Sequence, residues 1–250
     1  MAEPALALRD HPQIIDLISV LEQNGLQKQK EEVQALVGYI DGMEEKLSQM
    51  MDEMKEMRLE VGKLHDKGIH ARCSQLLGAA EGKIHQVKSM VSTTKENLIS
   101  SAKQMVQTFQ EKGRSAMSHA AQALRIPTVL SRMGRGFAHA EKSMGQLAVR
   151  LDAMRGELHQ AGGHIKNAGL ALAGKEPQES KELSADKGVL AKLRSFVLYC
   201  GKAFSEMDRD TALTVERING GRSSVKTELQ GLKSAQAGQR RQAASKEQAR

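Results

Sequence analysis

Between residues 33 and 64 the chain carries apolar residues at every first and fourth position of a seven-residue repeat. The ten positions are Val33, Leu36, Ile40, Met43, Leu47, Met50, Met54, Met57, Val61 and Leu64. This is the pattern of a coiled-coil seam, and it predicts a helix from about Gln27 to Leu64. Val37 and Met51 widen the apolar stripe on one side, which favours a helical bundle over a two-stranded coil.

A second repeat of the same period runs from residue 130 to residue 172. Its first positions are Leu130, Phe137, Met144, Leu151, Leu158, Ile165 and Leu172, and its fourth positions are Met133, Ala140, Leu147, Met154, Ala161 and Ala168. If unbroken to Gly174, this helix is ~70 Å long at ~1.5 Å per residue. Gly134, Gly162 and Gly169 flank the seam and would let a neighbouring helix approach closely. A bend or interruption at Gly162-Gly163 is the alternative.

Weaker patterns predict three more helices and two segments without helix. The further helices cover residues 11–23, 71–124 and 188–232, and the second of them ends where Pro127 disfavours helix at the preceding residue. Residues 175–187 are polar, contain Pro177 and indicate a linker. Residues 233–250 are rich in Ala, Gln, Arg and Lys and indicate a disordered basic tail. We therefore expect a bundle over residues 11–174 and an added helical segment over residues 188–232.

Composition agrees with an all-α, elongated helical bundle of long, coiled-coil-like helices. The chain has no Trp, four Phe and two Tyr, so Met, Leu, Val, Ile and Ala must fill the core. Such a core suits slender helices better than sheets, which favour aromatic and β-branched residues.

The charge is unevenly distributed. Residues 1–70 hold eight Lys and Arg against fourteen Asp and Glu, a net charge of −6, whereas residues 71–174 carry +8 and residues 175–250 carry +5. The acidic first segment could pair with the basic later helices, or a basic face could be left for a partner.

Candidate membrane and redox features are few. No segment approaches the ~18 uncharged apolar residues of a spanning helix. The first residues lack the basic-then-apolar layout of a signal peptide, so we expect a cytoplasmic protein. Cys73 and Cys200 are the two cysteines, and we expect free thiols.

Three stretches of the chain carry a resemblance to a known family. They are PQIIDLISVLEQNGLQKQKEEVQALVGYIDGMEEKL, FQEKGRSAMSHAAQALRIPTVLSRM and QAGGHIKNAGLALAGKE, which begin at residues 12, 109 and 160. Together they resemble an uncharacterised family of helical bacterial proteins associated with mobile or conjugative elements of gut Firmicutes. The resemblance covers residues 12–176 well and the remainder loosely. It implies a helical cytoplasmic protein and supplies no activity, cofactor or catalytic residue.

No catalytic or metal-binding motif is recognisable. The pairs His65/His70 and His159/His164 are spaced by five, which does not align two imidazoles on one helix face, and no HExxH motif or Cys/His cluster accompanies them. The sequence contains no GxSxG, GxGxxG or GxxxxGK[ST] motif. We therefore expect no enzyme, no catalytic residue, no metal or other cofactor, and no small-molecule substrate.

Three binding hypotheses remain. The clustered methionines of the first seam indicate either core filling or an adaptable groove for a partner helix. Basic residues favour weak, nonspecific nucleic-acid binding as an alternative, because phosphate neutralisation needs only Lys and Arg. The candidate phosphate contacts are Arg114, Arg125, Arg132, Arg135, Arg240 and Arg241. Residues 189–200 are amphipathic and basic, but a bundle helix shows the same pattern, so we do not expect a membrane partner.

The sequence thus predicts a non-enzymatic helical interaction or scaffold protein, encoded on a bacterial mobile element. It would act through coiled-coil contacts with a protein partner or with itself, using the seams at residues 33–64 and 130–172. The alternative is a nucleic-acid-binding accessory protein that uses residues 112–166 and the C-terminal tail.

Overall fold

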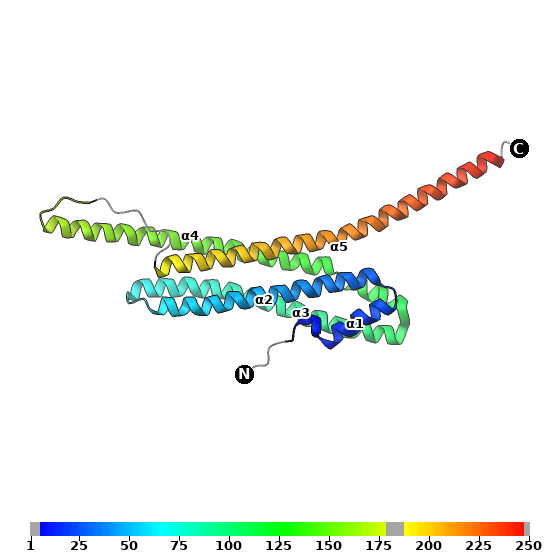
Figure 1. Ribbon diagram of the computed structural model, residues 1–250, viewed down its shortest axis with the longest axis horizontal. Coiled ribbons are helices and arrows are strands. Elements are labelled where there is room, and N and C mark those ends of the chain that lie inside the picture. The colour runs from blue at the N-terminus through cyan, green and yellow to red at the C-terminus, as the bar shows by residue number, and fades with distance from the viewer. Residues whose placement is uncertain (1–5, 179–187, 248–250) are drawn as a thin grey trace.

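The computed structural model describes residues 6–178 and 188–247, with the side chains of residues 114–123 and 219–247 outside the description. The elements are η1 (Leu8–Asp10), α1 (Pro12–Gln23), α2 (Gln27–Gly62), α3 (Lys67–Ala123), α4 (Ile126–Leu172) and α5 (Val189–Glu247). The described residues contain no strand. The predicted all-α, elongated bundle of long helices is confirmed (Figure 1). Over the same residues, no helix is both long and apolar enough to cross a membrane.

Local backbone geometry explains the end of α1, the beginning of α4 and a break within α3. Gly25 takes a positive φ of 66° after α1, a conformation that glycine adopts without steric cost. Arg125 has a φ of 45° and turns the chain into α4, where Pro127 occupies the first turn. Within α3, Gly113 has φ 77° and ψ −170°, so the helix is broken there, a feature that the sequence pattern did not predict.

The bundle consists of two antiparallel helix pairs stacked on each other. Helix α2 lies beside α3, and α4 lies beside α5 (Figure 1). The two helices of each pair pack more closely against each other than one pair packs against the other. Helix α1 contacts both α2 and α3. Because the two pairs meet along α2/α5 and along α3/α4, any groove between them runs parallel to the bundle axis.

The first predicted seam forms the core of the bundle. Nine of its ten residues, from Val33 to Val61, are 0–7% exposed, and Leu64 packs partly buried against them. The methionines clustered on α2 are Met43, Met50, Met51, Met54 and Met57. All of them are buried except Met51, which is half-buried. The α2 face is therefore occupied within the chain, and its methionines fill the core rather than line an open groove, apart from Met57 at its edge.

The second seam is buried over only part of its length. Leu130, Phe137, Met144 and Leu151 are 0–1% exposed, whereas Ile165 is 74% and Leu172 is 92% exposed. Helix α4 nevertheless continues through Gly162 and Gly163 without interruption. The repeat therefore runs past the end of the bundle. We call residues 158–172 the α4 overhang (Figure 1).

The C-terminal region differs from the prediction in two ways. Its residues Leu193, Val197 and Phe204 are 0% exposed and belong to the same core cluster as α2 and α4, so residues 188–232 do not form a separate segment. Helix α5 also extends to Glu247, so the tail predicted to be disordered from residue 233 is helical to that point. Its Ala, Gln, Arg, Lys and Glu residues make no apolar stripe but are strong helix formers. Of the predicted linker, residues 175–178 are non-helical, and residues 179–187 lie outside the described residues.

Two polar contacts connect distant parts of the chain. The carboxylate of Asp41, which is 8% exposed, accepts hydrogen bonds from the Leu8 amide at 2.7 Å and the Arg9 Nε at 2.9 Å. These bonds hold η1 against α2. The Tyr39 hydroxyl donates to the Met207 carbonyl at 2.5 Å and contacts the Thr211 hydroxyl, which connects α2 to α5. Burial raises the pKa of Tyr39 well above its ordinary value, so the phenol stays protonated.

Gly134 lies where α4 and α5 approach closely, as its position beside the seam predicted. A Cβ atom at this position would lie 2.8 Å from the Asp208 Oδ1 and 3.3 Å from the Thr211 Cγ2. Gly162 and Gly169, which hold the equivalent position later in the repeat, have nothing within 4 Å. Of these three glycines in the described part of α4, only Gly134 therefore lies at a close approach.

Polar substitution of Leu47 and Met54 tests whether the first seam carries the fold. We expect Leu47→Asn with Met54→Asn to lower the free energy of unfolding by about 3–6 kcal/mol, because each buries an amide in an apolar site. Denaturant titration followed by circular dichroism measures this change. The matched control is Leu59→Asn at a side chain that is 70% exposed, which should shift stability by no more than ~0.5 kcal/mol. An unchanged double variant would contradict a buried seam.

Two glycine-to-alanine substitutions in α4 should act in opposite directions. Gly134→Ala should destabilise the protein by about 1–3 kcal/mol, since the hydrogen-bonded Thr211 cannot move away from the new methyl group. A Cβ atom at Gly145 would have no neighbouring atom within 4 Å, so Gly145→Ala should stabilise the helix by up to ~1 kcal/mol. Thermal unfolding of both variants measures the two changes in stability. Stabilisation by both would show that α5 does not pack closely on Gly134.

Candidate functional site

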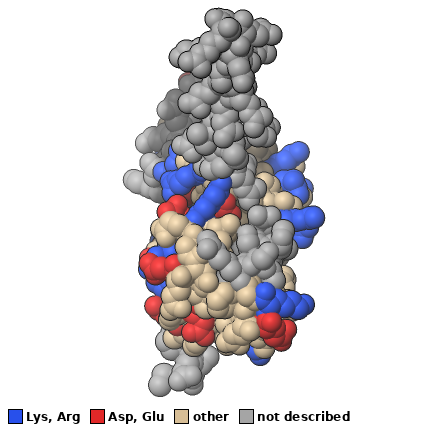
Figure 2. Space-filling view, turned by 90° about the vertical axis from the view of Figure 1, so that its right-hand side faces the viewer, with Lys and Arg blue, Asp and Glu red and all other residues tan. Residues whose placement is uncertain are grey.

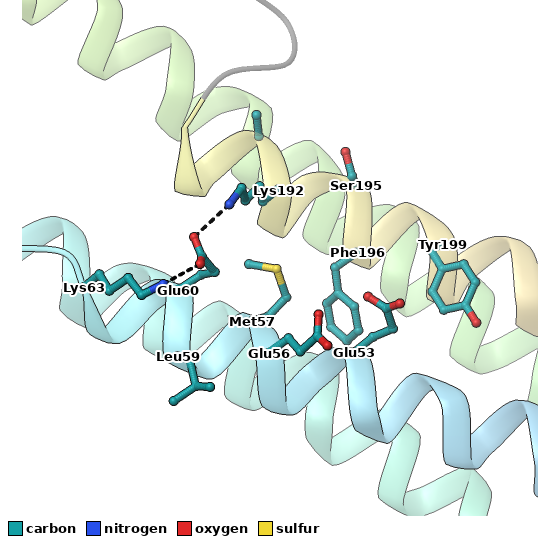
Figure 3. Close-up of a pocket in the computed structure, with 11 residues that line it drawn as sticks. Glu53, Glu56, Met57, Leu59, Glu60, Lys63, Lys192, Ser195, Phe196 and Tyr199 are labelled. Atoms are coloured by element: carbon teal, nitrogen blue, oxygen red, sulfur yellow. Dashed lines mark hydrogen bonds and ion pairs between the residues drawn. The ribbon is translucent and has the colours of Figure 1, made fainter.

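A groove of about 730 Å³ lies between the end of α2 and the beginning of α5 (Figure 3). It follows one of the two seams between the helix pairs. Its lining residues are Glu53, Glu56, Met57, Leu59, Glu60, Lys63, Ala191, Lys192, Ser195, Phe196 and Tyr199. Met57 and Phe196 are 7% and 5% exposed and form an apolar floor. Their side chains lie between the two helices, whereas Leu59 and Ser195 point away (Figure 3).

Glu60 closes one end of the groove. Its carboxylate accepts a hydrogen bond from Lys63 Nζ at 2.7 Å and another from Lys192 Nζ at 2.9 Å, so it joins α2 to α5 (Figure 3). The hydrogen bonds from Lys63 and Lys192, together with their positive charges, lower the pKa of Glu60 from 4.5 to about 2. The two ammonium groups at this end therefore share one negative charge, and the cluster keeps a net charge of +1.

Two further carboxylates make the wall of the groove acidic. Glu53 and Glu56 are exposed and, among the described interactions, neither takes part in an ion pair or hydrogen bond. The charge of Glu53 also acts across the groove, on Tyr199. Burial raises the pKa of Tyr199 most, and the charges of Cys200 and then Glu53 raise it further. Tyr199, which is 41% exposed, adds an aromatic face and a hydroxyl group. An apolar floor beside uncompensated carboxylates fits a helix with an apolar face and basic flanks.

Both cysteines lie in the core, outside the lining of the groove. Both cysteines are free and 0% exposed, as predicted for free thiols. Burial raises the pKa of Cys73, and burial followed by the charge of Glu53 raises that of Cys200 to about 12, so neither forms a thiolate at neutral pH. Within the described part of the chain, no three His, Cys, Asp or Glu side chains gather closely enough to hold a metal ion.

The α4 overhang is the second unusual surface. Every residue from 155 to 174 is half-buried or exposed, and the apolar positions continue there as Leu158, Ile165 and Leu172. Between residues 158 and 172 the charged side chain is Lys166, and the segment contains no Asp or Glu. The overhang is thus an apolar-faced helix with a basic character.

The overhang and the groove lie at the same end of the bundle. Arg194 Nε contacts Asp152 Oδ1 at 2.5 Å, and Arg72 Nη1 contacts Glu157 Oε2 at 3.8 Å, so the bundle ends near residue 157 of α4. Lys192 and Glu60 mark the same level on α5 and α2. A second groove of about 400 Å³ lies at this end along the α3/α4 seam and includes Arg72 and Glu157, which face each other.

The candidate phosphate contacts are only partly described. Arg125, Arg132 and Arg135 are exposed near the start of α4, while the side chains of Arg114, Arg240 and Arg241 lie outside the described residues. Figure 2 shows the end of the bundle opposite the overhang, where Lys and Arg lie along the right edge and at the upper left, and Asp and Glu lie mainly on the left and below. The visible surface therefore mixes both signs rather than presenting one basic field.

Sequence reasoning found the overhang residues but not the groove. Leu158, Ile165 and Leu172 were predicted as seam residues, whereas the structure leaves the last two without a covering helix. Glu56 and Phe196 were not singled out, because the groove joins residues more than 130 positions apart. The available signal was a pair of acidic residues beside a seam methionine, which is also typical of an ordinary solvated face.

Comparison with known proteins gives little functional information. A family model described as "Family of unknown function (DUF6674)" matches residues 10–250. No curated protein and no solved structure matches the chain.

The Glu60 contacts predict a specific pH dependence. Because folding lowers the pKa of Glu60, its contribution to stability is present above the ordinary value of 4.5 and is lost as the pH falls towards about 2. Both partner side chains are more than half exposed, Lys63 at 69% and Lys192 at 57%, so solvent screening keeps the effect small. We expect the difference in melting temperature between the wild type and Glu60→Gln to be constant above about pH 5 and to shrink below it. Glu56→Gln serves as the control and should show no such step.

Proposed function

We propose that this chain, which belongs to the Family of unknown function (DUF6674), is a non-enzymatic interaction protein that acts through helix–helix contacts. The proposal also takes up two finer expectations from its sequence, a scaffold role inside a bacterial cell and a gene carried on a mobile element. The family has no described activity, so the support for an interaction role comes from the surfaces of this molecule.

The observation that supports an interaction role is the exposed continuation of the α4 repeat. Ile165 and Leu172 are 74% and 92% exposed, although they continue the same series as the buried Leu151. Each large apolar side chain gains about 1.5–3 kcal/mol when it is fully removed from water. A helix that keeps its seam for two further repeats beyond the bundle therefore favours packing against another helix.

The chemistry of the described side chains favours binding over catalysis. The groove between α2 and α5 is open, its carboxylates Glu53 and Glu56 face solvent, and Ser195 points away from it (Figure 3). The Cys200 thiol behind it is buried and protonated. Such a site has an apolar floor and charge, as docking surfaces do, but no activated nucleophile.

Nonspecific nucleic-acid binding is the second candidate. It is favoured by Arg125, Arg132 and Arg135, whose side chains are exposed near the start of α4. Binding of this kind depends on phosphate neutralisation and weakens steeply as salt increases. Helix docking through apolar residues depends far less on salt, so a salt series separates the two candidates.

Substitutions in the overhang test the proposed function. The full-length protein is labelled, incubated with extract of its native host, and its complexes are sized by sedimentation. We expect Ile165→Ser with Leu172→Ser to weaken complex formation at least about tenfold, because two interface side chains lose their apolar burial.

The matched control is Val149→Ser, which changes an apolar side chain that is 69% exposed on the same helix within the bundle. It should leave the complex intact. A complex that survives the overhang substitutions, or that disappears with nuclease and added salt, would contradict a helix-mediated role and favour the nucleic-acid alternative.

A further inference from the structure

We propose that the partner of the α4 overhang is a second copy of this chain, and that each overhang lies in the α2/α5 groove of the other copy. This inference rests on the proposed function and names its partner and its surface. The resulting assembly is an end-to-end dimer in which the exchange is reciprocal. Such an interface is self-complementary, as expected for a two-fold dimer.

The placement of the two surfaces permits this exchange. The groove and the overhang are both at the end of the bundle marked by Glu60, Lys192 and Glu157. A two-fold axis perpendicular to the bundle would therefore bring each overhang past the end of the other bundle. The overhang of one copy would then run antiparallel to α2 of its partner.

The lengths of the two surfaces also agree. From residue 158 to residue 172 the overhang rises about 21 Å, at ~1.5 Å per residue. The groove extends along α2 from Glu53 to Lys63, about 15 Å on the same scale. The overhang is therefore long enough to fill the groove when the two bundle ends meet.

Charge and polarity are complementary across the proposed contact. The groove presents the carboxylates of Glu53 and Glu56 beside an apolar floor, and its lining, with three Glu and two Lys, has a net charge of −1. The overhang presents Ile165 and Leu172 with Lys166, whose ammonium group contacts the neutral amide of Gln178 at 3.0 Å. Since residues 158–172 hold no acid, the overhang carries no charge that repels Glu53 and Glu56.

The glycines of the overhang are consistent with close packing. Gly134 allows α5 to approach α4, and Gly162 and Gly169 occupy the same position of the repeat with nothing within 4 Å. The face that contacts α5 within the bundle therefore continues onto the overhang in a form that a second helix could approach closely.

A charge-exchange experiment tests the dimer. The association of the full-length protein is measured by sedimentation equilibrium for the wild type, for Lys166→Glu, for Glu53→Lys with Glu56→Lys, and for all three together. Each set alone places like charges at both reciprocal contacts, so we expect the dissociation constant to rise at least about tenfold. The combined variant restores opposite charges and should recover most of the affinity.

Two controls separate folding from association. Lys142→Glu, at an exposed position of α4 within the bundle, should leave the dimer unchanged. The circular dichroism spectrum should be unaltered in every variant, because the substituted side chains are exposed.

The outcomes distinguish this inference from the proposed function. If Ile165→Ser with Leu172→Ser breaks the dimer while the groove substitutions do not, the overhangs pair with each other and the groove assignment is wrong. If the protein is monomeric but its complex with a host protein still needs Ile165 and Leu172, the second copy is the wrong partner and the proposed function stands. Failure of both assays overturns both.

Discussion

The structure depends on burying long apolar stripes that are built almost without aromatic residues. Four long helices share one core of Met, Leu, Ile, Val and Ala, to which Phe137 and Phe204 are the largest contributors. Apolar seams that repeat every seven residues pack best when the helices lie nearly parallel over many turns. The core is therefore long and thin, and the molecule is elongated for the same reason (Figure 1).

Stacking two helix pairs leaves grooves along the seams where they meet. The α2/α5 seam is held by Tyr39 at one level and by the Glu60–Lys192 ion pair at another. At its open end the floor of the groove is apolar, because core positions such as Met57 and Phe196 reach the edge of the bundle. A potential binding surface thus arises from the same packing that makes the fold, without any dedicated loop or motif.

The sequence predicted the helices and their inner faces because the seven-residue period follows directly from helix geometry. The pattern could not show where a neighbouring helix ends. Leu151 and Leu172 look alike in sequence, yet one is 0% and the other 92% exposed. It also missed the helical tail of α5, since helix propensity without an apolar stripe resembles disorder in composition. The groove was out of reach because it needs the register of α2 against α5, which local patterns do not contain.

The placement of the two tyrosines gives the molecule a built-in optical reporter. With no tryptophan present, the intrinsic fluorescence comes from Tyr39 and Tyr199. The Tyr39 ring is partly buried, with its hydroxyl group hydrogen-bonded between α2 and α5, whereas Tyr199 borders the groove and is 41% exposed. Soluble quenchers therefore reach Tyr199 more readily, while the emission of Tyr39 reports on the contact between α2 and α5.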